Sequence, residues 1–243
     1  MADGQVQFDI TDAILEAAEK YVSPERLAAY YLLSRGNRKI GLLLYERNTE
    51  LSEALYGVIQ GLEVTLRNAI HNAITEQFGH DDWYDKAGLA QSEMEAIQKA
   101  KDSIRGAGEF VTSGRVIAEV NFGFWVRLCS GYYDKTIWTS YIRRVFPIKV
   151  RRKMLHSRLM DLKSLRNRIA HHQRIIGGKR ELARDYADIL ETISWLSPEM
   201  SLWVSSTNCF LARAEKKLRK LPKPEKPQAV GAAVPISPPE NQS

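Results

Sequence analysis

The stretch "NTELSEALYGVIQGLEVTLRNAIHNAITEQFGH", residues 48–80, decides the fold. Its apolar residues recur every three or four positions, which gathers them on one face of an α-helix. Thr49 is a candidate N-cap and Gly79 a candidate stop signal, so the pattern predicts one long amphipathic helix over about residues 50–78. The apolar face consists of Leu51, Leu55, Val58, Leu62, Leu66, Ile70, Ala73 and Ile74.

Helical patterns continue on both sides of this stretch. Ser23-Pro24 is an N-cap followed by proline at the first helical position, and it predicts a helix to about residue 35. Ser92 and Glu95 have the spacing of a capping box, which predicts a helix over about residues 92–105. A second long helix is predicted within "IKVRRKMLHSRLMDLKSLRNRIAHHQRI", residues 148–175, with "GG" at 177–178 ending the segment. Its apolar stripe consists of Met154, Leu155, Leu159, Leu162, Leu165 and Ile169. Shorter helices are expected at about residues 115–128, 135–145, 181–195 and 199–220.

No alternating run of β-branched residues is long enough to demand a sheet, so the fold class is all-α. We expect a single all-helical domain over residues 1–220. From residue 221 the chain is rich in proline and poor in residues that could form a core, which predicts a disordered tail over residues 221–243.

Composition favours a soluble, cytoplasmic protein without cofactors. The 243 residues are 44% hydrophobic, enough for a core without disulfides. The two cysteines, Cys129 and Cys209, stand far apart in apolar surroundings, so both are expected to be core thiols in a reducing compartment rather than zinc ligands. We find no leader-like N-terminus, no apolar run that could span a membrane, no glycine-rich phosphate loop and no nucleophile elbow.

Positive charge is concentrated in one part of the chain. Residues 143–180 hold thirteen Lys or Arg and one Asp, a net charge of +12, so the remainder carries −6 against the total of +6. Such a concentration suits a polyanion such as nucleic acid; a solvated helix face, or partners for the acidic remainder, is the alternative. The residues expected to contact RNA are Lys149, Arg151, Arg152, Lys153, Arg168 and Arg174.

The motif "LRNRIAHH", residues 165–172, lies in this basic segment. Asn167 and His171 are four residues apart and share one helix face, and the long side chain of Arg166 reaches across from the neighbouring face. RNA cleavage without a metal needs a base for the 2′-hydroxyl proton, an acid for the departing 5′-oxygen and positive charge near the phosphorane. Histidine can serve in either proton transfer and arginine supplies the charge, so the motif is a candidate active site.

Two other interpretations remain open for the motif. Adjacent histidines diverge by about 100° around a helix and are poorly placed to bind one metal ion. A structural Arg-Asn-His cluster that bridges buried helices is the second alternative.

The motif and its surroundings resemble a known family. "SLRNRIAHHQRI" is similar to the R-N-x-x-x-H signature of HEPN domains, and the fuller form R-N-x-x-A-H-H resembles the Abi-like (abortive infection) branch. Four further stretches are similar to blocks that surround this motif in Abi-like proteins, and the resemblance covers about residues 50–204. They are "LYGVIQGLEVTLRNAI", "HDDWYD", "NFGFWVRLCSGYYDKTIW" and "ETISWLSPEMSLWV".

This resemblance implies a HEPN-like helical bundle and a metal-independent endoribonuclease of phage defence or of a toxin–antitoxin system. Its partners would be RNA and an antitoxin, either protein or RNA. The implied catalytic residues are Arg166, Asn167, His171 and His172, and which of the two imidazoles moves the proton stays open. Glu63, Arg67 and Asn68 match a supporting Glu-x-x-x-Arg-Asn helix; an ion pair between residues 63 and 67 that positions this helix is the alternative role. A non-catalytic helical module that binds RNA or protein is the alternative function.

A homodimer is also expected. In-line cleavage needs an acid and a base on opposite sides of the phosphate, whereas each chain carries one motif. Two-fold pairing of the motif helices would bring Arg166, Asn167 and His171 from both chains around one cleft, and HEPN domains commonly pair in this way. The similar run "LRNAIHN", residues 66–72, offers His71 as an alternative second imidazole within one chain.

Overall fold

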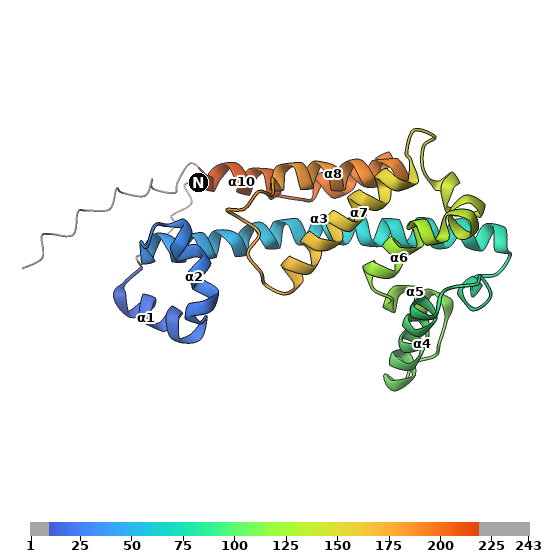
Figure 1. Cartoon of the computed structure of the whole chain (residues 1–243), viewed down its shortest axis with the longest axis horizontal. Helices are drawn as coiled ribbons and strands as arrows, with labels where there is room; N and C mark the ends of the chain where they lie inside the picture. Colours follow the sequence, from blue (N-terminus) through green and yellow to red (C-terminus); the bar gives the residue numbers. More distant parts are fainter. Residues whose placement is uncertain (1–9, 219–243) are drawn as a thin grey trace, which may run out of the picture. The chain divides into compact units, whose positions relative to one another are not determined.

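The structure is a computed structural model that describes residues 10–218. All regular elements in this range are helices (Figure 1), which confirms the all-α prediction. Residue contacts divide the range into two compact units, residues 10–45 and residues 46–218, and α3 (Arg38–Phe78) contributes to both. The single domain over residues 1–220 stays a prediction, and the predicted tail lies outside the described residues.

The first unit contains α1 (Asp12–Tyr21), α2 (Pro24–Leu33) and the beginning of α3. The Ser23 side chain accepts a hydrogen bond from the Arg26 amide, which confirms the predicted start of α2. Glu19 accepts two hydrogen bonds of 2.8 Å from Arg38.

The long helix α3 begins earlier than predicted. It starts at Arg38 rather than near residue 50, and Thr49 is an exposed residue within it rather than its N-cap. The Asn37 side chain accepts a hydrogen bond of 3.0 Å from the Ile40 amide in the first turn. Gly79, with a φ of +78°, follows the last helical residue as predicted.

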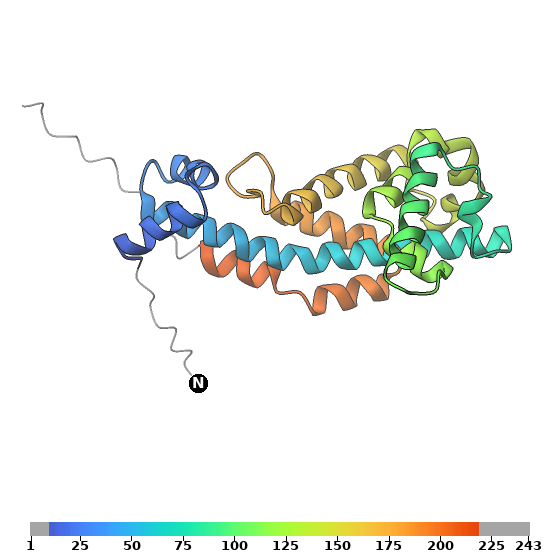
Figure 2. The same cartoon turned by 90° about the horizontal axis from the view of Figure 1, so that it is seen from below.

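After α3, the second unit continues with two groups of helices. The first group consists of η1 (Trp83–Asp85), α4 (Gln91–Gly106), α5 (Ser113–Glu119), α6 (Phe122–Leu128), η2 (Gly131–Tyr133), η3 (Asp134–Trp138) and η4 (Ile142–Val145). The later ones are α7 (Arg152–Ala170), α8 (Leu182–Leu196), α9 (Pro198–Ser206) and α10 (Phe210–Leu218). Figures 1 and 2 show α7 and α8 running beside α3.

The predicted capping box at Ser92 and Glu95 is wrong. The Ser92 hydroxyl donates to the Glu93 carboxylate, which also accepts a hydrogen bond of 2.6 Å from the Tyr133 hydroxyl. The Tyr133 hydroxyl also accepts a hydrogen bond of 2.9 Å from the Ala90 amide. The buried tyrosine therefore replaces the local cap at the start of α4.

The helix predicted over residues 199–220 is broken between α9 and α10. Asn208 causes the break, because its side chain accepts from the Phe210 amide and donates to the Ala54 carbonyl at 2.8 and 2.7 Å. Cys209 lies in this break and is exposed, so its prediction as a core thiol is wrong. Cys129 is buried as predicted, and burial raises the pKa of its thiol to about 12.

The core of the second unit is built from the faces that the periodicity predicted. Every apolar residue predicted for the face of α3 is buried, and so are those predicted for α7 except Met154, which is 43% exposed. Tyr186, Ile189 and Ile193 of α8 complete this layer. Within residues 10–218, no helix has an apolar stretch long enough to cross a lipid bilayer.

Candidate functional site

The motif lies where α7 ends. Arg166 and Asn167 lie near its C-terminal end, His171 is the C-cap, and His172 has a left-handed φ of +53°. The sequence interpretation treated both histidines as helical, which is wrong because the helix ends at Ala170. Asn167, His171 and His172 are all exposed, so the motif faces solvent.

A Schellman motif fixes this helix end. The His172 amide donates to the Ile169 carbonyl at 3.0 Å, and the Gln173 amide donates to the Arg168 carbonyl at 2.7 Å. Glycine normally occupies the left-handed position of such a motif, because a side chain there costs about 1–2 kcal/mol. Here the position holds His172, so the chain keeps an imidazole where the backbone favours glycine.

At position 172, glycine should therefore give a more stable fold than alanine. We expect His172→Gly to exceed His172→Ala in free energy of unfolding by about 1 kcal/mol, because both lack the imidazole and only the alanine retains the strain. Urea unfolding of the two variants measures the difference. Equal midpoints would contradict the assignment of strain, and RNA cleavage by the same pair reports on whether the imidazole is used.

An ion pair between α3 and α7 holds the arginine of the motif. Arg166 Nε donates to Glu63 Oε1 at 2.8 Å, with the two side chains 32% and 24% exposed. Glu63 thus pairs with Arg166 rather than with Arg67, whose Nε donates to Asn68 Oδ1 at 3.1 Å. The bond at Nε leaves both terminal amino groups of Arg166 as donors for a phosphate.

The loop that follows the histidines is held from two sides. Asn48, which is only 4% exposed, accepts from the Ile175 amide at 2.7 Å and donates to the Gln173 carbonyl at 3.4 Å. The guanidinium of Arg168 donates to the Arg174 carbonyl. Sequence reasoning missed Asn48, since its partners lie more than 120 residues away.

Loss of the Asn48 amide should destabilise the second unit. Asn48→Leu leaves the Ile175 amide without its partner in a buried place, so we expect the free energy of unfolding to fall by about 2 kcal/mol. Chemical denaturation measures this effect. Asn72→Leu, at an exposed position of the same helix, is the control and should shift stability by less than about 0.5 kcal/mol. Similar losses for both variants would refute the specific role of Asn48.

His71, the alternative second imidazole, has a different environment. Its Nδ1 accepts a hydrogen bond of 3.0 Å from Trp83 Nε1, and Trp83 is fully buried. Burial lowers the pKa of His71, although Asp81 opposes this shift. The His71 imidazole therefore has a structural role, because its hydrogen bond joins η1 to α3.

Five of the six predicted RNA contacts separate into two groups, and the sixth, Arg174, is half-buried. Lys149, Arg151 and Lys153 are exposed around the start of α7. Arg152 lies 2.9 Å from Asp134 in an ion pair, and Arg168 binds the carbonyl of Arg174. These two arginines have structural partners, which the charge count could not reveal. Within residues 10–218, no group of three His, Cys, Asp or Glu side chains is placed to hold a metal ion.

Fold and site define an all-helical protein with an exposed Arg-Asn-His motif at a helix end in a basic region. Residues 39–177, more than half of the chain, match the family model described as "Abi-like protein", and the chain belongs to this family. The family suggests a part in abortive infection, a form of phage defence. No curated protein and no solved structure matches the chain. The match includes Glu63 and the whole motif but ends before the block "ETISWLSPEMSLWV", for which the resemblance stays a prediction.

Proposed function

We propose that this chain is a metal-independent endoribonuclease of the HEPN type that acts in phage defence. The observation that carries the proposal is the ion pair from Glu63 to Arg166 beside the exposed histidines at the end of α7. The ion pair orients the Arg166 guanidinium, and the imidazoles of His171 and His172 lie near it at the solvent-exposed end of the helix. In a toxin–antitoxin system the chain would have the same activity as the toxin, and a protein or RNA antitoxin would control it.

The chemistry follows from these groups. An imidazole takes the proton of an RNA 2′-hydroxyl, and the resulting oxygen attacks the adjacent phosphorus. The bond from phosphorus to the 5′-oxygen breaks, and a second group, acting as an acid, protonates that oxygen. The Arg166 guanidinium stabilises the charge on the phosphorane. The products carry a 2′,3′-cyclic phosphate and a 5′-hydroxyl, and no metal ion enters the reaction.

We further propose that this acid is a side chain of another copy of the chain. His71 is bonded to Trp83, which supports a partner chain's motif over the alternative within one chain. Light scattering should give about twice 27.7 kDa. If subunits exchange, mixing His171→Ala with Arg166→Ala protein should restore part of the cleavage. A monomer with full ribonuclease activity would refute the composite site.

The proposed activity is tested with purified full chain and labelled tRNA and mRNA in EDTA. We expect cleavage by the wild type and cleavage slower by about a hundredfold or more with His171→Ala. RNA binding without cleavage by the wild type would instead favour the non-catalytic module. Cleavage only after Mg²⁺ is restored would contradict the mechanism.

A further inference from the structure

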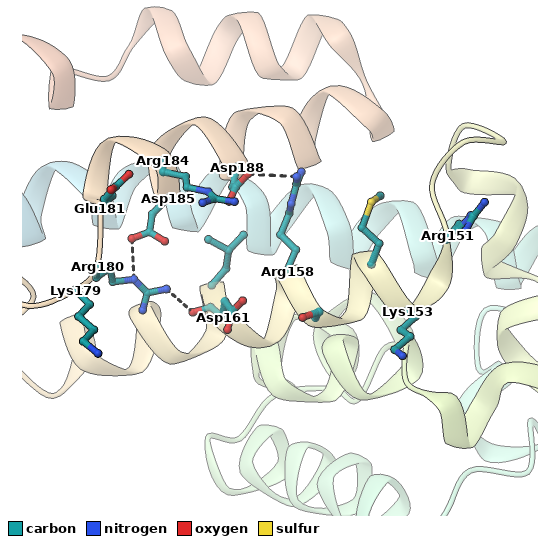
Figure 3. A pocket seen from close by; sticks show the side chains of 13 residues that line it. Arg151, Lys153, Arg158, Asp161, Lys179, Arg180, Glu181, Arg184, Asp185 and Asp188 are labelled. Carbon is teal, nitrogen blue, oxygen red and sulfur yellow. Dashed lines mark hydrogen bonds and ion pairs between the residues drawn. The ribbon is translucent and has the colours of Figure 1, made fainter.

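A groove separate from the motif runs between α7 and α8 (Figure 3). Its volume is about 940 Å³, and residues 179–181 line one end of it. Two of its arginines are held by acids. Arg158 pairs with Asp188 and Glu191 at 3.2 and 2.7 Å, and Arg180 pairs with Asp185 at 2.7 Å.

Four other cations line the groove without an ion pair to any side chain within residues 10–218. They are Arg151, Lys153, Lys179 and Arg184, and all four are exposed. Figure 3 shows Arg151 and Lys153 toward one end, Lys179 at the other and Arg184 on α8. Asp161 and Glu181 line the groove as well, so its six cations stand against four acids and leave a net charge of +2 for a ligand.

A second, smaller hollow lies between the groove and the motif. It shares Lys179 and Arg180 with the groove and is also lined by Arg168 and Arg174, next to the loop that Asn48 holds. At 1.5 Å per helical residue, the path from Arg151 to Arg168 along α7 is about 25 Å long. A row of cations of this length suits the backbone of a single-stranded nucleic acid.

We propose that this groove binds the single-stranded RNA segment that flanks the cleaved phosphate. This assignment rests on the proposed function, because it takes the cleaved phosphate to lie at the motif, and the smaller hollow beside the groove borders the loop after His172. Lys179 and Arg184, neither of which was predicted from the sequence to contact RNA, bind phosphates there. Contacts to phosphates carry no base identity, so the groove binds RNA with little dependence on sequence.

The test measures binding and cleavage separately. A fluorescein-labelled, 15-nucleotide single-stranded RNA is titrated by anisotropy with full chain in EDTA at several salt concentrations, in the non-cleaving His171→Ala background. Adding Lys179→Gln and Arg184→Gln should weaken binding about tenfold and lower the slope of log affinity against log salt by about 1.4, which corresponds to two lost phosphate contacts. Lys86→Gln with Lys99→Gln, two exposed lysines outside the groove, removes the same charge and should leave the slope unchanged.

Each outcome bears on one of the two proposals. Unchanged affinity and slope in the groove variant would overturn the groove assignment even if the wild type cleaves RNA. Weaker binding in that variant, with no cleavage by wild type, would support the groove and refute the proposed function. A poly-glutamate peptide that displaces the RNA at equal concentration and depends on the same two residues would identify a protein-binding surface and overturn the assignment.

Discussion

Replacing His171 with alanine is expected to lower RNA cleavage by about a hundredfold or more, since general acid–base groups contribute about 10²–10⁴ to rate. The fold should survive, because the imidazole is exposed and the C-cap hydrogen bond uses the backbone amide of residue 171. Single-turnover cleavage of labelled RNA and circular dichroism measure the two effects.

The control for this variant is His80→Ala, another exposed histidine that lies outside the motif. It should cleave RNA at the wild-type rate. Wild-type cleavage by His171→Ala would remove this residue from the mechanism, and loss of helicity together with activity would assign it a structural role.

Removing Glu63 should lower cleavage by about 10- to 100-fold by releasing Arg166 rather than by removing a reacting group. Glu63→Gln keeps an oxygen that can accept the Nε hydrogen bond, so it should retain more activity than Glu63→Ala. The loss should appear mainly in kcat, because Glu63 orients a group that acts in the transition state.

A double-mutant cycle separates this positioning role from general destabilisation. In an Arg166→Ala background, Glu63→Ala should cost little further activity, since its partner is already absent. Additive losses in the cycle would show that Glu63 acts independently of Arg166.

Periodicity and charge predicted much of this molecule. The apolar faces of α3 and α7 are buried because repeats of three or four residues leave few other arrangements. The spacing also brought Arg166, Asn167 and His171 to one helix end. Local signals failed where tertiary partners replaced them: Tyr133 anchors α4 instead of a capping box, and Asn208 breaks the last helix.

The remaining features of the site depend on distant parts of the chain. Glu63 meets Arg166 across 103 residues, and Asn48 meets Ile175 across 127 residues. No pattern in a single sequence encodes such pairings. The left-handed conformation of His172 escaped prediction because glycine, its usual signal, is absent there.

The most direct test of the account is the end chemistry of RNA cut by wild-type protein in EDTA, read by mass spectrometry. Attack by the 2′-hydroxyl at the Arg166 and His171 site predicts 2′,3′-cyclic phosphate and 5′-hydroxyl ends, which should form about a hundredfold more slowly or not at all with His171→Ala. Products with 3′-hydroxyl and 5′-phosphate ends, or the cyclic products formed by the His171→Ala protein at the wild-type rate, would contradict it.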